Sequence, residues 1–464
     1  MARTKVTITY IPSSGEDGIL YLGEQHAKRW RLESGMIVLL RFGGAHKSLR
    51  LSVEPKSSCF RLHEATAGAW GLTSGTVLCL RYQAAGRILQ LGPLLGVLLR
   101  RIGTKSEKPF GNVTGFCREL SEAGKKLGVM VYFISAERLA GTGESLSGWS
   151  YSAGGWKSGS FPYPDAIYNR INSRVIENSP MVQRFLRSYK AKPGRALFNE
   201  RYLDKSEVFA ALRNEKAAKP YLPESYLYQN PDMMKRMLGR HSVLFLKPIL
   251  SSLGKGIIRV SKSGAGYVSQ TASVNGKVVR ARYPNQTALL KQLKTQMTGR
   301  RYLLQEGIEL IEVEGLSTDF RALVQRDDTG QWEVTSIVAR ISAKNTFVSN
   351  LARGGKLAPM KDAITRSNLA GPHREAAIAG LRKAALDIAQ SLEKQIDAHF
   401  AELGIDLAVD TRGRVRLLEI NSKPSKEDNT PLGADEGSDS TSGEMKVRPS
   451  VKRVVQYVRY LGKF

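Results

Sequence analysis

Two carboxylates and a carboxamide lie close together near the carboxyl end of the chain, in residues 404–424 (GIDLAVDTRGRVRLLEINSKP). Asp406 belongs to an apolar run, 405–409, and Glu419 belongs to a second run, 415–420, with Asn421 directly after it. The intervening Thr-Arg-Gly turn predicts a hairpin, in which side chains two residues apart share a face. Hard oxygen ligands of this kind suit Mg²⁺. The sequence therefore predicts a metal site at Asp406, Glu419 and Asn421, although an exposed hairpin with scattered acids explains any one of them alone.

Two lysines upstream are candidates for binding an anion. The Asp-Lys-Ser-Glu sequence at 204–207 has the form of a capping box and predicts a helix over 205–213. Lys205 then lies in the first helical turn, where a cation is unfavourable unless an anionic ligand binds there. Lys247 ends a predicted strand, 243–248. Both lysines are thus positioned to meet phosphate groups.

A glycine-rich loop, SSLGKG at 251–256, joins the strand of Lys247 to another predicted strand, Ile257–Val260. Backbone N–H groups of such a turn can bind phosphates while the nearby lysine supplies charge. A simple hairpin turn is the alternative. The chain has neither the GxxxxGK[ST] loop between a strand and a helix nor a GxGxxG fingerprint, so the P-loop and Rossmann nucleotide sites are disfavoured.

Further binding groups follow in order. A strand-like segment, LLQEGI at 303–308, precedes accessible acids at Glu312 and Glu314, and its main chain could take an adenine edge while a carboxylate takes ribose hydroxyls. Arginine binds carboxylate or phosphate in a bidentate manner, and three arginines follow on strand-like stretches. They are Arg321, Arg340 and, after Asn350, Arg353. Surface arginines of a basic protein are the alternative.

Composition sets limits on the class of protein. The chain has 464 residues, enough for about three domains, with 42% hydrophobic residues and three cysteines that lack CxxC spacing. This pattern predicts globular domains in a reducing cytosol, without a signal peptide or a spanning segment. The net charge of +28 favours anionic partners such as nucleotide, nucleic acid, wall polymer or an acidic surface. A generally basic protein without a dedicated nucleic-acid role is favoured over a nucleic-acid-binding protein, because no reader motif accompanies the charge.

The amino-terminal 96 residues contain an internal repeat. The segment from Trp30 (WRLESG) recurs 40 residues later from Trp70 (WGLTSG), and LRF at 40–42 recurs as LRY at 80–82. Repetition of a strand-rich unit predicts a pseudo-two-fold β-barrel, for example of the double-psi type. Such a barrel serves either as a binding or docking module or as a structural cap. No polar constellation repeats with it.

The rest of the chain shows other patterns. A βαβ rhythm with a strand at 98–102, a helix at 112–127 and a strand at 129–134 predicts a small α/β domain. It is followed by the turn FPYPDAIYNR, whose Arg170 either contacts substrate or supports the turn. Apolar residues at helical spacing predict an amphipathic helix over 378–400 that leads into the hairpin. Residues 426–444 are polar, which predicts a mobile linker, and a basic amphipathic helix that docks on the body follows from about 449.

Taken together, the ordered motifs resemble the ATP-grasp superfamily, which includes glutathione synthetase, D-alanine–D-alanine ligase and the ribosomal-protein glutamate ligases. The resemblance covers about 199–426. FPYPDAIYNR, FNERYLDK, SNLARGGK and LLEINSKPS look most like YheC/YheD-type ATP-grasp proteins of endospore-forming bacteria, described as endospore coat-associated. This likeness extends over nearly the whole chain.

The resemblance implies a role for each motif. Lys205 and Lys247 would bind the nucleotide phosphates and the loop at 251–256 would close over them, with Ser252, Gly254, Lys255 and Gly256 as its members. Gln305, Glu306 and Ile308 would form the adenine hinge, with Glu312 at the ribose. Asp406, Glu419 and Asn421 would hold Mg²⁺ or Mn²⁺. The γ-phosphate and an acyl-phosphate would face Arg321, Arg340, Asn350 and Arg353.

The resulting prediction is an α+β protein with an ATP-grasp fold of two α+β subdomains that grip ATP. Its expected divisions are a duplicated β-barrel-like module at 1–96, an α/β pre-grasp domain at 97–198, the ATP-grasp domain at 199–426, and a linker with the terminal helix at 427–464. The implied activity is an ATP- and Mg²⁺-dependent ligase that activates a carboxylate as an acyl-phosphate for attack by an amine or similar nucleophile. The expected partners are ATP, unidentified carboxylate and amine substrates, and anionic polymer or spore-coat components, in the cytoplasm or at the spore. A nucleotide-binding structural protein of the spore coat with little or no turnover is the alternative.

Overall fold

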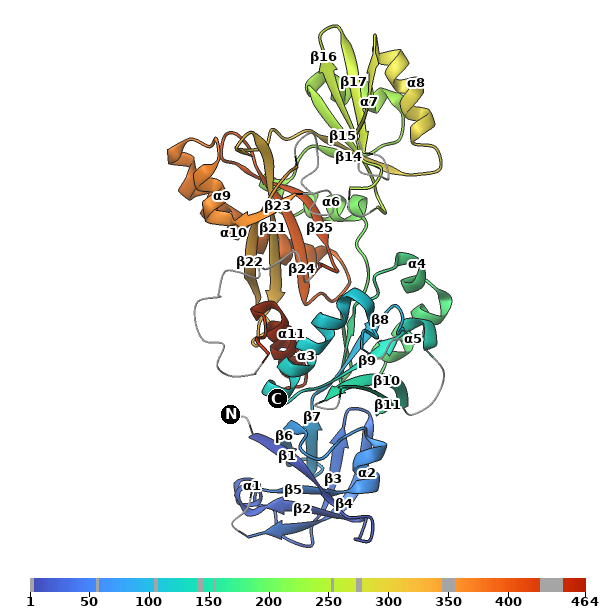
Figure 1. Cartoon of the computed structure of the whole chain (residues 1–464), viewed down its shortest axis with the longest axis vertical. Coiled ribbons are helices and arrows are strands. Elements are labelled where there is room, and N and C mark those ends of the chain that lie inside the picture. The colour runs from blue at the N-terminus through green and yellow to red at the C-terminus, as the bar shows by residue number, and fades with distance from the viewer. Residues whose placement is uncertain are drawn as a thin grey trace.

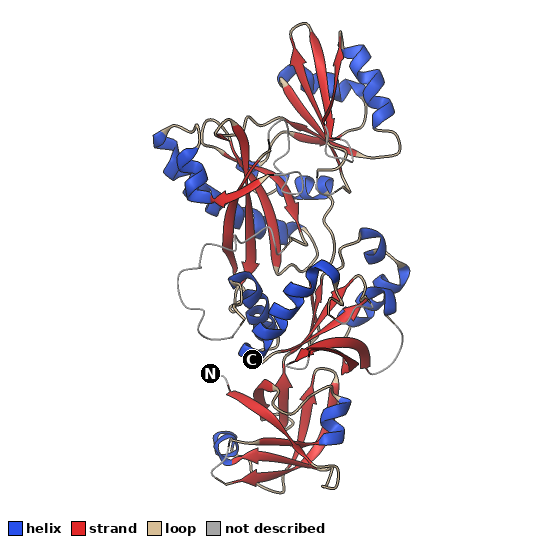
Figure 2. Ribbon diagram, viewed as in Figure 1, coloured by secondary structure: helices blue, strands red, loops and turns tan. Residues whose placement is uncertain are grey.

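The computed structural model describes residues 4–55, 58–103, 107–139, 145–152, 155–251, 254–272, 278–343, 355–425 and 445–464. Four β-sheets follow one another along the long axis of the molecule (Figure 1). Figure 2 shows that helices lie against the faces of the upper three sheets. The predicted linker at 427–444 lies outside the described residues.

The amino-terminal repeat folds into a closed barrel, as predicted. Its strand order is β1-β5-β2-β4-β3-β7-β6. Helix α1 (Glu24–Trp30) and helix α2 (Glu64–Ala69) begin 40 residues apart, the period of the sequence repeat. The strands are β1 (Thr4–Ile11), β2 (Ile19–Gly23), β3 (Ile37–Phe42), β4 (Ala45–Glu54), β5 (Phe60–His63), β6 (Val77–Gln83) and β7 (Ile88–Gly92). Alternate apolar side chains fill the barrel because successive strand residues point to opposite faces.

A second sheet, in the order β11-β10-β9-β8-β12-β13, follows the barrel. Its strands are β8 (Leu94–Leu99), β9 (Met130–Ser135), β10 (Ser145–Ser152), β11 (Gly155–Pro162), β12 (Ala166–Asn169) and β13 (Ala196–Phe198). Its helices are α3 (Thr114–Leu127), α4 (Arg174–Glu177) and α5 (Pro180–Lys190). The strand predicted at 98–102 was placed too late. β8 pairs in parallel on both sides and all its residues are buried, so it reads as a continuous apolar run without alternation.

Residues 225–306 form an antiparallel sheet with two helices, here called the small lobe. The strand order is β14-β19-β15-β16-β17-β18. The strands are β14 (Ser225–Leu227), β15 (Val243–Pro248), β16 (Ile258–Ser263), β17 (Gly266–Ala272), β18 (Val278–Tyr283) and β19 (Tyr302–Glu306). Helices α7 (Pro231–Arg240) and α8 (Gln286–Gln296) cover one face and share a core with β15 and β16.

Residues 307–425 form the hairpin lobe, whose sheet has the order β23-β22-β21-β24-β25, with β20 paired to β21. The strands are β20 (Glu312–Val313), β21 (Leu316–Arg326), β22 (Trp332–Ile341), β23 (Lys356–Pro359), β24 (Glu402–Val409) and β25 (Val415–Asn421). Helices α6 (Lys205–Arg213), α9 (Met360–Arg366) and α10 (Gly371–Gln395) pack on it. The helix predicted over 378–400 ends at Gln395, because Ile396 has extended backbone, although Ile396 and Phe400 stay in the core and so keep the apolar spacing.

The carboxyl-terminal helix, α11 (Pro449–Leu461), docks on the body of the protein. Its valines share a buried core with α3 (Figure 1). Arg448, just before it, contacts the buried Glu119 of α3 with Nη2 at 2.6 Å from Oε2. Among the helices of the described ranges, none is long and apolar enough to cross a membrane.

Candidate active site

The predicted hairpin exists and brings its two acids together. Asp406 on β24 lies directly opposite Glu419 on β25. The register then shifts, so that β25 holds one extra residue and both Leu418 and Glu419 line the same cleft. A bulge of this kind re-aims a side chain beside a functional site. Asn421, opposite Gly404, lines the cleft as well.

The turn between the arms is held by one acid. Asp410 accepts hydrogen bonds from the backbone N–H groups of Arg412 at 3.0 Å and Arg414 at 2.9 Å. Gly413 has a φ of 79°, a conformation that favours glycine. This local bonding sets the register of the arms and with it the position of Asp406 against Glu419.

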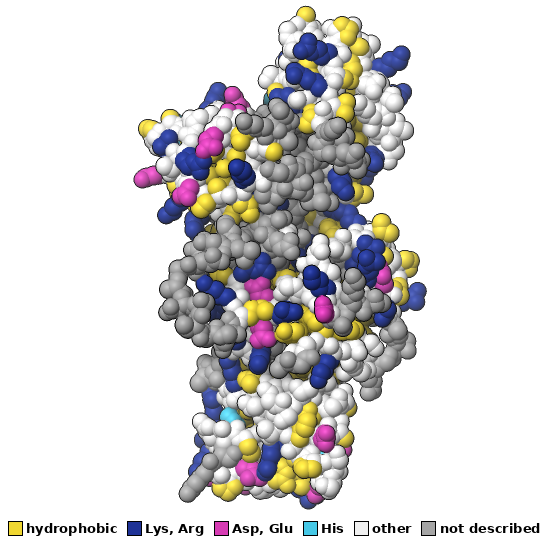
Figure 3. All heavy atoms as spheres, in the orientation of Figure 1, with side chains coloured by type: hydrophobic (Ala, Val, Ile, Leu, Met, Phe, Trp, Pro, Cys, Tyr) yellow, Lys and Arg dark blue, Asp and Glu magenta, His cyan; other side chains and the backbone are white. Residues whose placement is uncertain are grey.

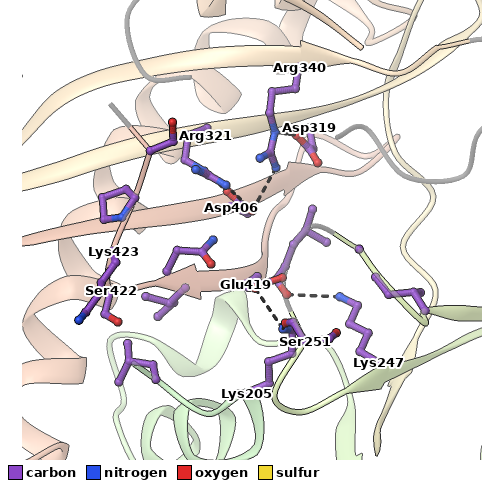
Figure 4. Close-up of a pocket in the computed structure, with 18 of the residues that line it drawn as sticks. Lys205, Lys247, Ser251, Asp319, Arg321, Arg340, Asp406, Glu419, Ser422 and Lys423 are labelled. Atoms are coloured by element: carbon purple, nitrogen blue, oxygen red, sulfur yellow. Dashed lines mark hydrogen bonds and ion pairs between the residues drawn. The ribbon is translucent and has the colours of Figure 1, made fainter. Parts of the chain in front are cut away.

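A cleft of about 480 Å³ lies where the small lobe, the hairpin lobe and the α/β sheet meet. Figure 4 shows basic side chains of the small lobe and α6 on one side, and the acids of the hairpin on the other. The predicted site residues that line this cleft are Lys205, Lys247, Gly254, Gln305, Glu306, Ile308, Arg321, Arg340, Asp406, Glu419 and Asn421. Segments about two hundred residues apart in the sequence therefore face each other across one space.

Lys205 opens helix α6 as the capping box predicted. Asp204 caps the helix by accepting from the N–H groups of Ser206 and Glu207. The Lys205 ammonium lies 3.1 Å from Glu419 Oε1 and donates to the Ser251 carbonyl oxygen at 2.6 Å. Lys205 therefore joins the start of the glycine-rich loop to the acid of the hairpin.

Lys247 is a buried ammonium group at the end of β15. It donates to Gln305 Oε1 at 2.5 Å and to the Leu418 carbonyl oxygen at 3.3 Å. The pKa of Lys247 is lowered to about 8, mainly by burial and also by the nearby charge of Lys205, although Glu419, Asp406 and Asp319 act in the opposite direction. An anion in the cleft would stabilise the charged form of this lysine.

Two arginines hold Asp406 ionised. Arg321 Nη2 lies 3.0 Å from Asp406 Oδ2 and its Nε contacts Oδ1, while Arg340 Nη2 lies 3.2 Å from Oδ2. Arg340 also bonds Asp319 through Nε at 2.6 Å. Burial opposes the charge on Asp406, but the two guanidinium groups hold its pKa below the ordinary value. Both predicted arginines thus line the cleft, and both contact the predicted metal ligand Asp406.

The predicted adenine hinge joins the two lobes. Gln305 is buried and its Nε2 donates to Ser225 Oγ at 2.9 Å, so its side chain is already engaged. Glu306 contacts Arg416 of β25, and its Oε2 lies 3.5 Å from His241 Nδ1. His241 Nε2 in turn lies 2.7 Å from Glu224. The backbone N–H groups of Glu306 and Gly307 donate to the carbonyl oxygens of Glu224 at 2.9 Å and Val243 at 2.8 Å, and Ile308 follows in the lining of the cleft.

The wall contributed by the α/β sheet was largely missed by sequence analysis. Arg174 stacks on Tyr202 at 4.5 Å and both line the cleft, as does Arg170. Lys423 forms a buried ion pair with Glu177, and burial lowers the pKa of this lysine to about 8. The sequence signals for this wall were the motifs FPYPDAIYNR, which contains Arg170, and FNERYLDK, which contains Tyr202, but neither motif assigned Tyr202 to the cleft.

Some predicted residues do not line the cleft. In the described ranges, Lys255, Gly256 and Glu312 are outside the lining, and Glu312 lies on β20 opposite Ser317. Three predicted residues lie outside the described residues: Ser252, Asn350 and Arg353.

The donor set fits a hard divalent cation. The arginines favour the ionised form of Asp406, and their contacts use three of the roughly four lone-pair positions of its carboxylate, so among the described contacts about one position, on Oδ1, is left for a cation. Glu419 is less buried and opens to the cleft, with Asn421 beside it. Carboxylate and carboxamide oxygens are ligands that Mg²⁺ accepts together with water and phosphate.

The fold and the order of these groups define an ATP-grasp protein, and sequence comparison agrees. Residues 194–461, more than half of the chain, match the family described as YheC/D like ATP-grasp. The chain belongs to this YheC/D-like ATP-grasp family.

Two relatives from Bacillus subtilis (strain 168) are similar along much of the chain. Endospore coat-associated protein YheD is 25% identical over 338 residues, covering 73% of this chain and 74% of YheD. Endospore coat-associated protein YheC is 24% identical over 276 residues, covering 58% and 73%.

Solved structures of ATP-grasp ligases align at lower similarity. D-alanyl-alanine synthetase A from Vibrio cholerae O1 biovar eltor gives a TM-score of 0.44 at 12% identity, over 80% of this chain and 98% of that one. The ligase PsnB with a minimal precursor gives 0.40 at 13% identity, over 72% and 92%.

Proposed function

We propose that this protein is an ATP- and Mg²⁺-dependent ligase that joins a carboxylate to an amine or similar nucleophile through an acyl-phosphate. The observation that carries the proposal is the meeting of Lys205 with Glu419 at 3.1 Å, beside Lys247 and Asp406, in one cleft. A purely structural protein has no evident need for this set of ionised groups at low exposure. Membership of the ATP-grasp family supports the same class of activity.

The chain's own residues have separable roles in this reaction. Lys205 and Lys247 bind the phosphates, and the hinge main chain at 305–308 receives the base. Asp406, Glu419 and Asn421 would hold Mg²⁺, which when bound neutralises charge on the transferring phosphoryl group. Arg321 and Arg340 keep Asp406 ionised and add positive potential where negative charge develops.

The proposed chemistry has two balanced steps. A substrate carboxylate oxygen forms a bond to the γ-phosphorus while the bond to the β,γ-bridging oxygen breaks, which releases ADP. The amine then attacks the acyl carbon, phosphate leaves, and the amine gives up a proton to solvent. The names of the two relatives support a place for the product at the endospore coat.

ADP release in the presence of pairs of acids and amines tests the proposal. We expect a productive pair to give ADP with the wild type. Glu419→Gln should lower the rate at least about 100-fold, because the variant loses a charged ligand of the metal that would neutralise the transferring phosphoryl group. Circular dichroism and ADP binding verify that the variant is folded. Unchanged turnover in Glu419→Gln would refute the metal assignment. ATP binding without ADP release for any pair would favour a nucleotide-binding structural protein.

A further inference from the structure

The positive charge of the ATP-grasp region is concentrated in the small lobe. Residues 225–306 contain fourteen Lys and Arg side chains against two acids, a formal charge of +12, whereas residues 307–425 contain sixteen of each kind. In Figure 3, Lys and Arg side chains are spread over the lobe of β15–β18 at the top, while acids gather with them on the lobe of α9 and α10. Among the described residues, Lys247 is the one small-lobe cation that lines the cleft. Nucleotide binding therefore leaves most of this charge unexplained.

The arginines of the sheet lie on its open face. Strand alternation places Leu244, Ile258 and Val260 toward α7 and α8, where they are buried. The opposite face carries one row of cross-strand neighbours, with one residue from each of the strands β15 to β18. In that order they are Phe245, Arg259, Gln270 and Arg280. The adjacent row ends in Arg282, opposite Val268. This set, Arg259, Arg280 and Arg282, is called the arginine row below.

The arginine row has excess positive charge. Arg259 Nη1 donates to Gln270 Oε1 at 2.7 Å, and burial together with the charge of Arg280 lowers the pKa of Arg259. Arg280 and Arg282 are exposed. In the part of the chain that the structure describes, no carboxylate forms an ion pair with any of the three. The two acids of the small lobe have other partners: Glu306 pairs with Arg416, and Asp232 lies 2.9 Å from Lys235. Guanidinium groups gathered in this way attract an anion.

The arginine row leads into the active-site cleft. Phe245 lines the cleft, and Arg280 lies three strands away in the same row, a span of about 14 Å at ~4.8 Å between strands. An extended peptide covers that span with about four residues at ~3.4 Å each.

We propose that the arginine row binds an extended acidic polypeptide segment and that this segment presents a carboxylate to the cleft. The second part rests on the proposed ligase function. Arginine pairs with carboxylates in a bidentate manner, and an acidic polypeptide carries the type of group that the ligase would activate. Nucleic acid is disfavoured because, in the described residues of these two rows, no aromatic ring lies beyond Phe245 on which bases could stack.

The proposal is tested by fluorescence anisotropy with the full chain, without ATP and at ~0.1 M salt. The labelled probes are octaglutamate, octaglutamine and an eight-nucleotide oligothymidylate. The variant Arg280→Gln/Arg282→Gln removes two exposed cations from the row. The matched control, Lys291→Gln/Lys294→Gln, removes two exposed cations from α8, which covers the other face. We expect the first variant to weaken octaglutamate binding at least about fivefold and the control less than about twofold. Octaglutamine should not bind.

Three outcomes would overturn the proposal. Absence of octaglutamate binding refutes the surface, and equal weakening by both variants shows that diffuse charge alone attracts the peptide. Tighter binding of the oligothymidylate, sensitive to Arg280→Gln/Arg282→Gln, would make the face a nucleic-acid site. Because the assay needs no turnover, its result is independent of whether ADP release is found in the ligase assay.

Discussion

The two lobes that enclose the cleft differ in how far their charged side chains are paired with opposite charges. In the hairpin lobe, buried charges are paired in advance, since Asp406 contacts Arg321 and Arg340, and Arg340 contacts Asp319. In the small lobe, Lys247 is buried with neutral hydrogen-bond partners and the arginine row has no acid opposite it among the described residues. The hairpin lobe is therefore organised before a ligand arrives, whereas the small lobe is completed electrostatically by an anion.

Substitutions in the two lobes should therefore differ in whether they change stability or ligand affinity. Breaking a buried ion pair exposes the full cost of desolvating the charge that is left, so changes in the hairpin lobe should lower stability. Changes to an unpaired cation should act mainly on ligand affinity.

Asp406→Asn should lower the free energy of unfolding by about 3–5 kcal/mol, because Arg321 would remain buried without its carboxylate and Arg340 would keep only its ion pair with Asp319. Urea unfolding of the protein without nucleotide measures this loss. Glu419→Gln is the control and should cost less, since the Glu419 side chain is 24% exposed against 10% for Asp406 and the Lys205 that remains keeps its hydrogen bond to the Ser251 carbonyl oxygen. Equal losses of stability in both variants would contradict the proposed difference between Asp406, which is paired within the hairpin lobe, and Glu419, which faces a ligand in the cleft.

Lys247 should make ADP binding depend on pH. Its pKa is lowered by burial to about 8, so it loses its proton as pH rises through 8, and ADP affinity should fall about tenfold between pH 7 and 9. The free energy of unfolding of the protein without nucleotide should instead increase as pH rises. Because the unfolded lysine has a pKa of 10.5, the unfolded state binds more protons from about pH 8 to 10.5 and stability rises with pH there.

Calorimetric titration of ADP at several pH values measures the first effect, with Lys247→Met as the control. In that variant ADP should bind more weakly and with little pH dependence over the same range. The charged groups that face Lys247 are Lys205, Glu419, Asp406 and Asp319, and a pH dependence that persists in Lys247→Met would assign it to one of them.

The contact between the lobes should have a smaller effect. Arg416 on β25 pairs with Glu306 at the hinge, and both side chains are partly exposed. Arg416→Gln should raise the Kd for ADP about threefold to fivefold by loosening the hinge, with little loss of stability. A double-mutant cycle with Glu306→Gln isolates the pair. Additive effects of the two changes would mean that the lobes are held together by other contacts.

The parts of the fold that follow local rules were predicted from sequence. The capping box at Asp204 placed α6 from Lys205 to Arg213 without error, and the Thr-Arg-Gly turn placed the hairpin. The repeat of 40 residues predicted the barrel because each unit keeps its strand alternation.

Features that depend on distant partners were not predicted. Nothing in the sequence near Asp406 shows that Arg321 and Arg340 would contact it, because the pairing arises only when β21, β22 and β24 become neighbours. The wall of Arg174 and Tyr202 was missed for the same reason. The end of α10 was predicted too late, since Phe400 is buried in the same core although it is not helical.

Glu312→Gln should leave the Kd for ADP unchanged within about twofold. The sequence order suggested a ribose contact for Glu312, but its strand β20 pairs with β21 and its backbone N–H donates to Asn368 Oδ1 at 2.9 Å, outside the cleft lining. A substitution that keeps this backbone bond should change little. ADP titration of the variant beside Arg416→Gln makes the comparison, since both positions belong to the hairpin lobe but only Arg416 contacts the small lobe at the hinge. A fivefold or larger loss of affinity in Glu312→Gln would restore the ribose role and would show that the lobes close further when nucleotide binds.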